Sequence, residues 1–178
     1  QVDVGILMGD LCGKMINPLV KQKDGTYRAT VLGQNMKIKT EEELQNIEKS
    51  IASMGNYSFR TDEEEMIQLK AEGKDVAGRV DERAANITLS KGKIDDIFRD
   101  LVVERMKQWM KLAEERLADS PVKVYMGAGN DDLMEVDDII KKSTAITLAD
   151  DNKVLVDDEF EMISSSWSNP TPWETERE

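Results

Sequence analysis

The sequence predicts an α/β fold built on a core of parallel strands. Two short segments, residues 2–8 and 122–126, are mostly apolar and each is followed by glycine and polar residues, which is typical of buried parallel strands. Amphipathic helical patterns occupy much of the chain between them. Apolar or alternating segments at 145–148, 153–156 and 160–163 predict an additional β region.

The composition and charge of the chain limit the kinds of function that it can have. The chain has 178 residues, enough for one domain with a substantial core, and a net charge of −12 with no histidine. Binding to nucleic acid or to an anionic membrane surface needs clustered lysine and arginine, so we expect neither as the main partner. No apolar run reaches the length of about 18 residues that a membrane span requires. The single cysteine, Cys12, fits a cytoplasmic protein.

The first predicted strand ends at Gly9 and Asp10. A turn at Lys23-Asp24-Gly25 separates two extended stretches, so residues 19–32 are predicted to form a hairpin. At Thr40 a capping box with Glu43 predicts the start of a helix, because each side chain can bond a backbone amide of the other.

Three more helices are predicted before the second core strand. A second capping signal begins at Thr61, in a helix expected to end at Gly73, and apolar spacing suggests another helix around 76–87. The strongest pattern covers 94–118, where one apolar stripe indicates packing against a core. Later in the chain, a helix is predicted at 134–142, and the proline-containing tail, residues 164–178, is predicted to be a loop.

The two core strands both end in groups that can bind a metal. Asp10 follows the first strand and Asn130 follows the second, each directly after a glycine. In open α/β sheets ligands bind at the carboxyl ends of strands, so neighbouring strands would bring these two side chains together. Segment 9–121 is several times longer than the whole of a βαβ unit, about 30 residues. We therefore expect a helical insertion, residues 40–118, within a single domain, residues 1–178.

In this combination the sequence resembles the calcineurin-like metallophosphoesterases, in a prokaryotic, archaeal-type branch. The motifs that carry the resemblance are Gly9-Asp10-Leu11-Cys12-Gly13-Lys14, Gly129-Asn130-Asp131-Asp132 and Ser168-Asn169-Pro170-Thr171-Pro172-Trp173. The resemblance implies a partial β-sandwich core with parallel strands and a large helical insertion. It also implies hydrolysis of a phosphoric ester by a water that two divalent metal ions (Mn, Fe, Zn or Mg) activate.

The resemblance also assigns roles to residues. Asp10 would bridge the two metals, and Asn130 would bind the second metal and hold the phosphate nearby. Asp131 stands where many relatives have a catalytic histidine, which puts help to the leaving group in doubt. The resemblance places Asp132 beside Asn130, where it could orient the amide by hydrogen bonding; an acid at a helix start can equally interact with the helix dipole. It places Lys14 near a bound phosphate, although a lysine in such a loop is more often simply solvated.

Most of the family's other ligands are missing from this sequence. An Asp-x-His strand would precede Gly9, and histidine motifs would follow the segment that ends at Trp173. We therefore expect an internal fragment that binds metal weakly and has little or no activity by itself. The expected substrate is a small phosphorylated molecule, and the exposed apolar core faces predict self-association.

Two other interpretations remain open from the sequence. The chain could be a non-catalytic acidic module that binds or scaffolds a partner. Alternatively, Asp131, Asp132, Asp137 and Asp138 could bind a divalent cation, although four carboxylates at this spacing are also typical of a solvated helix face.

Overall fold

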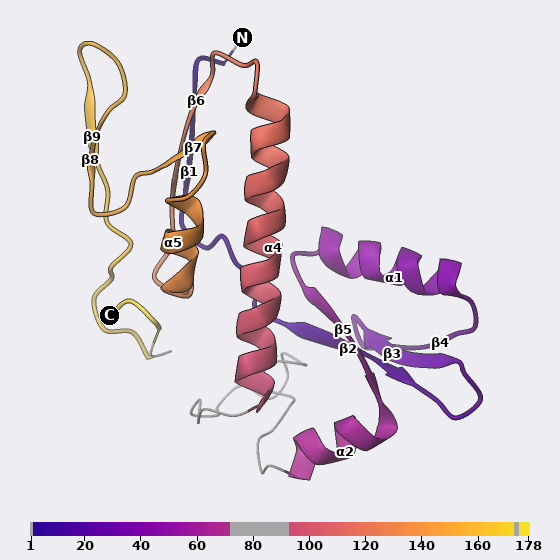
Figure 1. Cartoon of the computed structure of the whole chain (residues 1–178). Coiled ribbons are helices and arrows are strands. Elements are labelled where there is room, and N and C mark those ends of the chain that lie inside the picture. Colours follow the sequence, from indigo (N-terminus) through magenta and orange to yellow (C-terminus); the bar gives the residue numbers. More distant parts are fainter. Residues whose placement is uncertain (1, 72–92, 173–174) are drawn as a thin grey trace. The chain divides into compact units, whose positions relative to one another are not determined.

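The computed structural model describes residues 2–71, 93–172 and 175–178. The chain forms two compact units, each described by itself (Figure 1). Unit 1 consists of residues 1–12 and 102–178, and unit 2 consists of residues 13–101. The protein is of mixed α/β class, with parallel pairing in both units.

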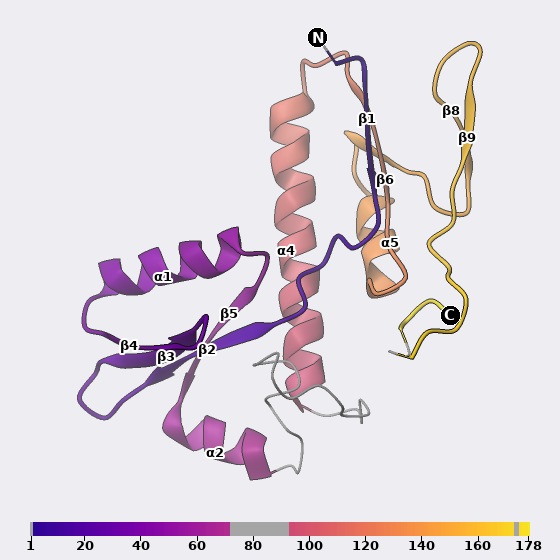
Figure 2. The same cartoon turned by 180° about the vertical axis from the view of Figure 1, so that it is seen from behind.

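Unit 1 contains a three-stranded parallel sheet. Its strands are β1 (Val4–Met8), β6 (Lys123–Gly127) and β7 (Ile146–Leu148), in the order β1-β6-β7. The register pairs Val4 with Lys123 and Met8 with Gly127, so β1 and β6 end at the same edge. The prediction that these two strands are parallel neighbours is confirmed, and Figures 1 and 2 show them side by side from opposite directions.

A hairpin of β8 (Lys153–Leu155) and β9 (Glu161–Ile163) packs beside this sheet. Tyr125 on β6 forms a buried cluster with Ala149 and Val154, and its hydroxyl donates to the Leu155 carbonyl over 2.9 Å. The apolar ring and the polar tip of one tyrosine thus bind the hairpin to the sheet.

Two helices complete unit 1. Helix α4 (Lys93–Leu117) agrees with the predicted range 94–118, and its first residues belong to unit 2. Its buried side chains in unit 1 are Val102, Met106 and Met110, which recur every four residues as a core-facing stripe requires. Helix α5 (Glu135–Ile140) precedes β7 and packs against it. Among the described residues, no helix is both long and apolar enough to span a membrane.

Unit 2 is built on a mixed four-stranded sheet. The strands β2 (Ile16–Lys21), β3 (Tyr27–Val31), β4 (Gln34–Ile38) and β5 (Tyr57–Asp62) lie in the order β4-β3-β2-β5. The hairpin predicted at 19–32 is confirmed by the antiparallel pairing of β2 with β3.

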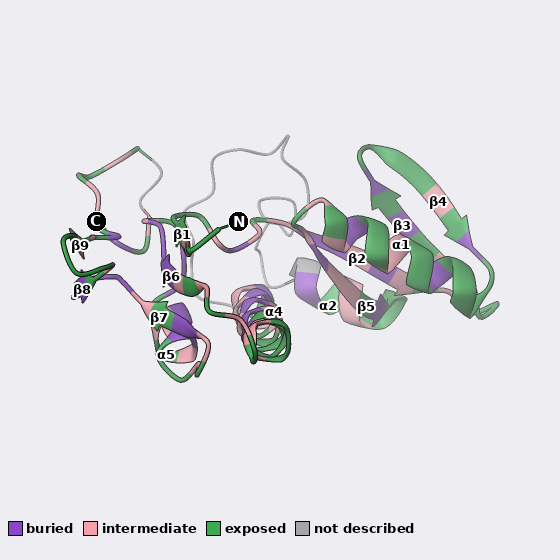
Figure 3. Ribbon diagram, turned by 90° about the horizontal axis from the view of Figure 1, so that it is seen from above, coloured by how far each residue is buried: buried purple, intermediate pink, exposed green. Residues whose placement is uncertain are grey.

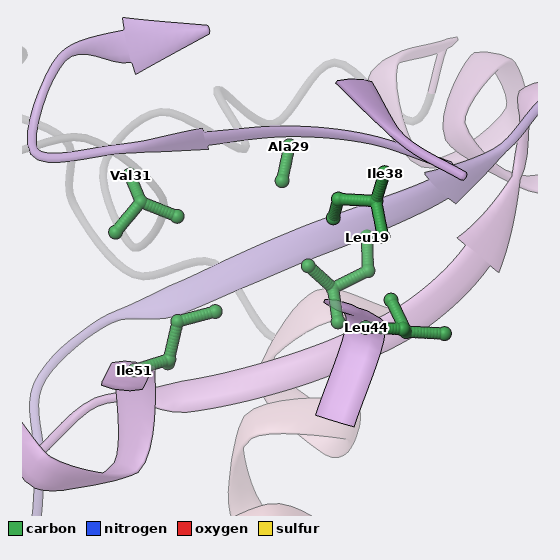
Figure 4. Close-up of a cluster of buried hydrophobic side chains, with 6 residues drawn as sticks. All are labelled: Leu19, Ala29, Val31, Ile38, Leu44 and Ile51. Carbon is green, nitrogen blue, oxygen red and sulfur yellow. The ribbon is translucent and has the colours of Figure 1, made fainter. Parts of the chain in front are cut away.

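Helix α1 (Glu41–Ser53) covers one face of this sheet. Both bonds of the predicted capping box are present: the Glu43 amide donates to the Thr40 hydroxyl, and the Thr40 amide donates to the Glu43 carboxylate. Leu44 and Ile51 are fully buried against strand residues (Figure 4). The cluster in that figure consists of Leu19, Ala29, Val31, Ile38, Leu44 and Ile51.

The insertion differs from the predicted helical segment, 40–118. The chain leaves unit 1 after Cys12 and returns at Val102. The described part of this excursion contains four strands as well as helices, including α2 (Glu63–Ala71). Strand β5 lies inside the range predicted to be helical and pairs in parallel with β2. It contains Thr61, the predicted helix cap; α2 begins at Glu63 instead, and Asp62 accepts from the Glu65 amide. The helix predicted around 76–87 and the stop at Gly73 lie outside the described residues.

Candidate functional site

The loop after β1 begins with two consecutive residues in the left-handed conformation. Gly9 has φ of 84° and Asp10 has φ of 43°. Glycine adopts positive φ without steric cost, and aspartate tolerates it better than most residues. The backbone therefore turns sharply where β1 ends and places Asp10 at the carboxyl edge of the sheet.

The loop after β6 approaches this turn closely at Gly129. A β-carbon on Gly129 would lie 2.3 Å from the Asp10 amide nitrogen and 2.6 Å from Asp10 Oδ1. No side chain fits at that separation, so the contact requires glycine. The carboxylate of Asp10 thus lies against the residue that immediately precedes Asn130.

Asp132 joins the two loops. Its Oδ2 accepts from the amides of Leu11 (2.9 Å) and Gly129 (2.7 Å), and its Oδ1 accepts from the amide of Cys12 (2.8 Å). The side chain is almost completely buried. Three charge-assisted bonds satisfy the buried carboxylate and fix the loop after β1 against the loop after β6.

The environment of Cys12 disfavours its thiolate form. Burial raises the pKa of the Cys12 thiol well above its ordinary range, and the charge of Asp132 raises it further. A thiol is reactive as its thiolate, so Cys12 acts as a small buried side chain.

Asn130 contacts the C-terminal segment, residues 164–178. Its Nδ2 donates to the Thr175 hydroxyl over 3.2 Å, and its backbone carbonyl accepts from the Arg177 amide over 3.1 Å. The Ser168 amide in turn donates to the Arg177 carbonyl. Where the structure describes it, the segment has no regular secondary structure except a short bridge at its start, as predicted, but it is anchored to the loop after β6.

Arg177 provides most of this anchoring. Its side chain is 1% exposed. The guanidinium donates to both carboxylate oxygens of Asp137, to Asp150 Oδ2 and to the hydroxyl of Ser166. It also donates to the backbone carbonyls of residues 132 and 133. Burial alone would lower the pKa of Arg177, but the hydrogen bond and charge of Asp137, with the charges of Asp150 and Asp132, raise it, so the guanidinium stays charged.

Asp150 lies just beyond the end of β7, the third strand of the sheet. Its Oδ2 accepts from the Ser166 hydroxyl (2.5 Å) and from Arg177 (3.3 Å). Its Oδ1 is buried and has no hydrogen-bond partner among the residues that the structure describes. Asp10, Asn130 and Asp150 therefore follow β1, β6 and β7 at one edge of the sheet.

The other predicted residues are placed differently. Asp131 is exposed beside Asn130, whereas Lys14 belongs to unit 2, just past the unit boundary. Of the four acidic residues considered as a separate cation site, Asp132 is bonded to backbone amides and Asp137 to Arg177. Those bonds remove two of the four carboxylates from that interpretation.

Sequence reasoning missed three contributors: Thr175, Arg177 and Asp150. Arg177 and Thr175 lie in a tail whose prolines predicted a loop, and nothing in the pattern distinguishes a buried arginine from a solvated one. A signal existed for Asp150, which follows the predicted strand 145–148 just as Asp10 and Asn130 follow theirs.

The donors at this edge suit a cation of hard or intermediate character. A carboxylate and an amide oxygen are ligands that Mg²⁺ and Mn²⁺ accept. However, no group of three or more His, Cys, Asp or Glu side chains within the described ranges is arranged to hold a metal ion.

Unit 2 has a hollow of its own, with a volume of about 900 Å³. Methionines from several elements line it, and none of the predicted site residues does so. These methionines are Met15, Met36, Met54 and Met66.

Comparisons of the chain with protein-family models, with curated proteins and with solved structures found no match.

Proposed function

We propose that unit 1 carries part of the divalent-metal site of a phosphoesterase, with Asp10 and Asn130 as oxygen ligands and a small phosphorylated molecule as substrate. One observation supports this most strongly. Strands β1 and β6 are parallel neighbours that end in register, and the Asp10 carboxylate lies against Gly129. Two ligand-type side chains therefore follow glycines at the same edge of one sheet, as the motifs of the metallophosphoesterases would require.

Each residue has a defined task in this proposal. Asp10, on its left-handed turn, would hold the metal ions through its carboxylate, and Asn130 would add an amide oxygen ligand. Asp132 holds the two loops together and makes no ligand bond, because its oxygens accept three backbone amides. Bound metal ions would supply an activated water and would neutralise charge on the phosphoryl group.

The sequence contains no histidine, so in this proposal the chain contributes two oxygen ligands and none of the family's histidine ligands. The sheet of unit 1 would likewise be one part of the β-sandwich of the family. With two oxygen ligands, we expect binding of Mn²⁺ in the range of about 0.1–1 mM, comparable with weak oxygen-ligand sites, and little or no turnover. A cytoplasmic location also belongs to this proposal.

A titration with Mn²⁺ followed by NMR tests the site. We expect paramagnetic broadening centred on the amides of residues 9–11 and 129–131, and its loss in the variants Asp10→Asn and Asn130→Ala. Asp158→Asn, in the exposed turn between β8 and β9, is the matched control and should leave the broadening unchanged. Broadening that spreads over acidic surface residues and survives both site substitutions would refute the metal site.

An assay with p-nitrophenyl phosphate and Mn²⁺ tests whether these two ligands are too few to support turnover. We expect turnover no faster than that of the Asp10→Asn variant. A metal-stimulated rate that Asp10→Asn abolishes would show instead that this chain holds a sufficient ligand set.

Self-association is a separate part of the proposal. Ile6, Leu7 and Met8 of β1 are each 40–50% exposed, whereas the last three residues of the neighbouring β6 are buried (Figure 3). An apolar strand at the edge of a sheet invites pairing with another chain. Light scattering should show oligomers that dissociate on dilution and that Leu7→Lys prevents; a wild-type monomer at all concentrations would contradict this.

A further inference from the structure

An asparagine ligand must present its oxygen to a cation, but its side-chain amide has two polar ends. Rotation by 180° exchanges the oxygen with the NH₂ group, which cannot bind a metal ion. A partner that bonds only to the NH₂ end would keep the oxygen available. The contacts of Asn130 identify such a partner in Thr175.

The hydrogen bonds of Thr175 define the direction of this contact. Its Oγ1 lies 2.7 Å from Glu178 Oε1 and 3.2 Å from Asn130 Nδ2. A hydroxyl has one proton to donate. Because that proton goes to Glu178, Oγ1 can only accept from its other neighbour, Asn130, and this requires the NH₂ end.

Glu178 stays an acceptor over a wide range of pH. Its Oε1 receives the hydroxyls of Thr171 (2.5 Å) and Thr175, together with the Thr175 amide (2.9 Å). The bonds from Thr171 and then from Thr175 lower the pKa of Glu178 to about 2. At neutral pH the carboxylate has no proton to give, so it cannot reverse the direction of the Thr175 hydroxyl.

The segment that carries Thr175 is held independently of this contact. Arg177, two residues later, bonds to the Asn130 carbonyl through its amide and is buried among the residues around α5 and β7. Thr175 and Asn130 are therefore fixed relative to one another by the backbone as well as by their side chains.

We propose that Thr175 is a positioning residue for Asn130, with Glu178 directing its hydroxyl so that the amide oxygen of Asn130 is kept for a cation. The orientation of the amide follows from the contacts above, and its use in metal binding rests on the proposed function.

The test uses the 178-residue chain and the side-chain NH₂ signals of Asn130, assigned by their disappearance in Asn130→Asp. Thr175→Val keeps the shape and removes the acceptor, and Thr175→Ser keeps the hydroxyl. Thr171→Val is the matched control, because it makes the same chemical change in the same segment and leaves the Thr175 contact to Asn130. We expect Thr175→Val to speed solvent exchange of the NH₂ protons about five-fold, the effect of an ordinary hydrogen bond. Thr175→Ser and Thr171→Val should stay close to wild type.

Unchanged exchange in Thr175→Val, or an equal acceleration in Thr171→Val, would overturn the positioning role. A second measurement separates this inference from the proposed function. Thr175→Val should weaken Mn²⁺ binding about ten-fold, as is usual when a ligand loses the group that orients it. Normal Mn²⁺ affinity in Thr175→Val would also overturn the role in binding. If wild type does not bind Mn²⁺ but Thr175→Val still accelerates exchange, the orientation stands and the proposed function fails.

Discussion

Asp137 and Arg177 form a two-point ion pair, in which Nη1 lies 2.8 Å from Oδ2 and Nη2 lies 3.0 Å from Oδ1. The arginine is buried and the aspartate is partly exposed. This pair joins α5 to the C-terminal segment, while the same guanidinium reaches Asp150 beyond β7. The segment is thus bound both to α5 and to the residues just after β7.

The first prediction concerns this pair. Arg177→Met should lower the free energy of unfolding by about 3–5 kcal/mol, since it leaves Asp150 buried without its cation and strands two backbone carbonyls. Arg60→Met is the control, because Arg60 bonds to Glu41 and Glu48 with both partners accessible to water, and should cost about 1 kcal/mol or less. Denaturant unfolding measured by tryptophan fluorescence gives both values. Equal losses would contradict the anchoring role of Arg177.

The second prediction compares two adjacent aspartates. Asp132→Asn turns one acceptor into a donor that faces backbone amides, so we expect a loss of at least about 3 kcal/mol. Asp131→Asn is the control, because it makes the same chemical change at an exposed neighbouring residue. Its free energy of unfolding should stay within about 0.5 kcal/mol of the wild-type value. Hydrogen exchange at the amides of Leu11, Cys12 and Gly129 should accelerate in the first variant only. If those amides stay protected, Asp132 does not hold the two loops together.

Local patterns predicted the helices and strands well where one signal was strong. The capping box at Thr40 marked the start of α1 because its bonds are local, and the long stripe of α4 set its length. Strand β5 was missed because its burial alternates only weakly and because its last residues, Thr61 and Asp62, carry a helix-start signal. Its pairing with β2, 41 residues away in register, is a tertiary relation that no local pattern contains.

For the candidate site as well, the sequence predicted what depends on local patterns and missed what depends on tertiary contacts. Asp10 and Asn130 follow recognisable strands, so their placement at one edge could be inferred from the strand-end rule. The roles of residues that depend on partners distant in the sequence could not be inferred in this way. The carboxylate of Asp132 was expected to orient Asn130, yet it accepts from the amides of residues 11, 12 and 129. The partner of Asn130 is Thr175, which lies in a tail whose sequence has no periodic pattern.

The third prediction concerns the close approach of the two loops. Gly129→Ala places a methyl group 2.3 Å from the Asp10 amide nitrogen and must move one loop away from the other. We expect a loss of about 1–3 kcal/mol or more and weaker binding of Mn²⁺. Gly5→Ala on β1 is the matched control, because its nearest neighbour, a methyl of Val124, would lie at an ordinary 3.7 Å. Gly5→Ala should therefore leave the free energy of unfolding close to that of wild type. Tolerance of Gly129→Ala would show that the loops can separate without cost.

The last prediction concerns pH. The folded-state pKa of Glu178 is about 2, below its unfolded value, because it accepts the hydroxyls of Thr171 and Thr175. A carboxylate with a depressed pKa contributes stability that is complete above the unfolded pKa and is lost as the pH falls through the folded pKa. The slow exchange of the Asn130 NH₂ protons, after correction for the intrinsic effect of pH, should therefore persist from pH 7 to about pH 3 and disappear only near pH 2. The ¹³C shift of the Glu178 carboxyl should titrate at the same low pH, and Thr171→Val should raise its midpoint. A midpoint at the ordinary value for glutamate, about 4.3, would mean that Glu178 does not hold the hydroxyl of Thr175.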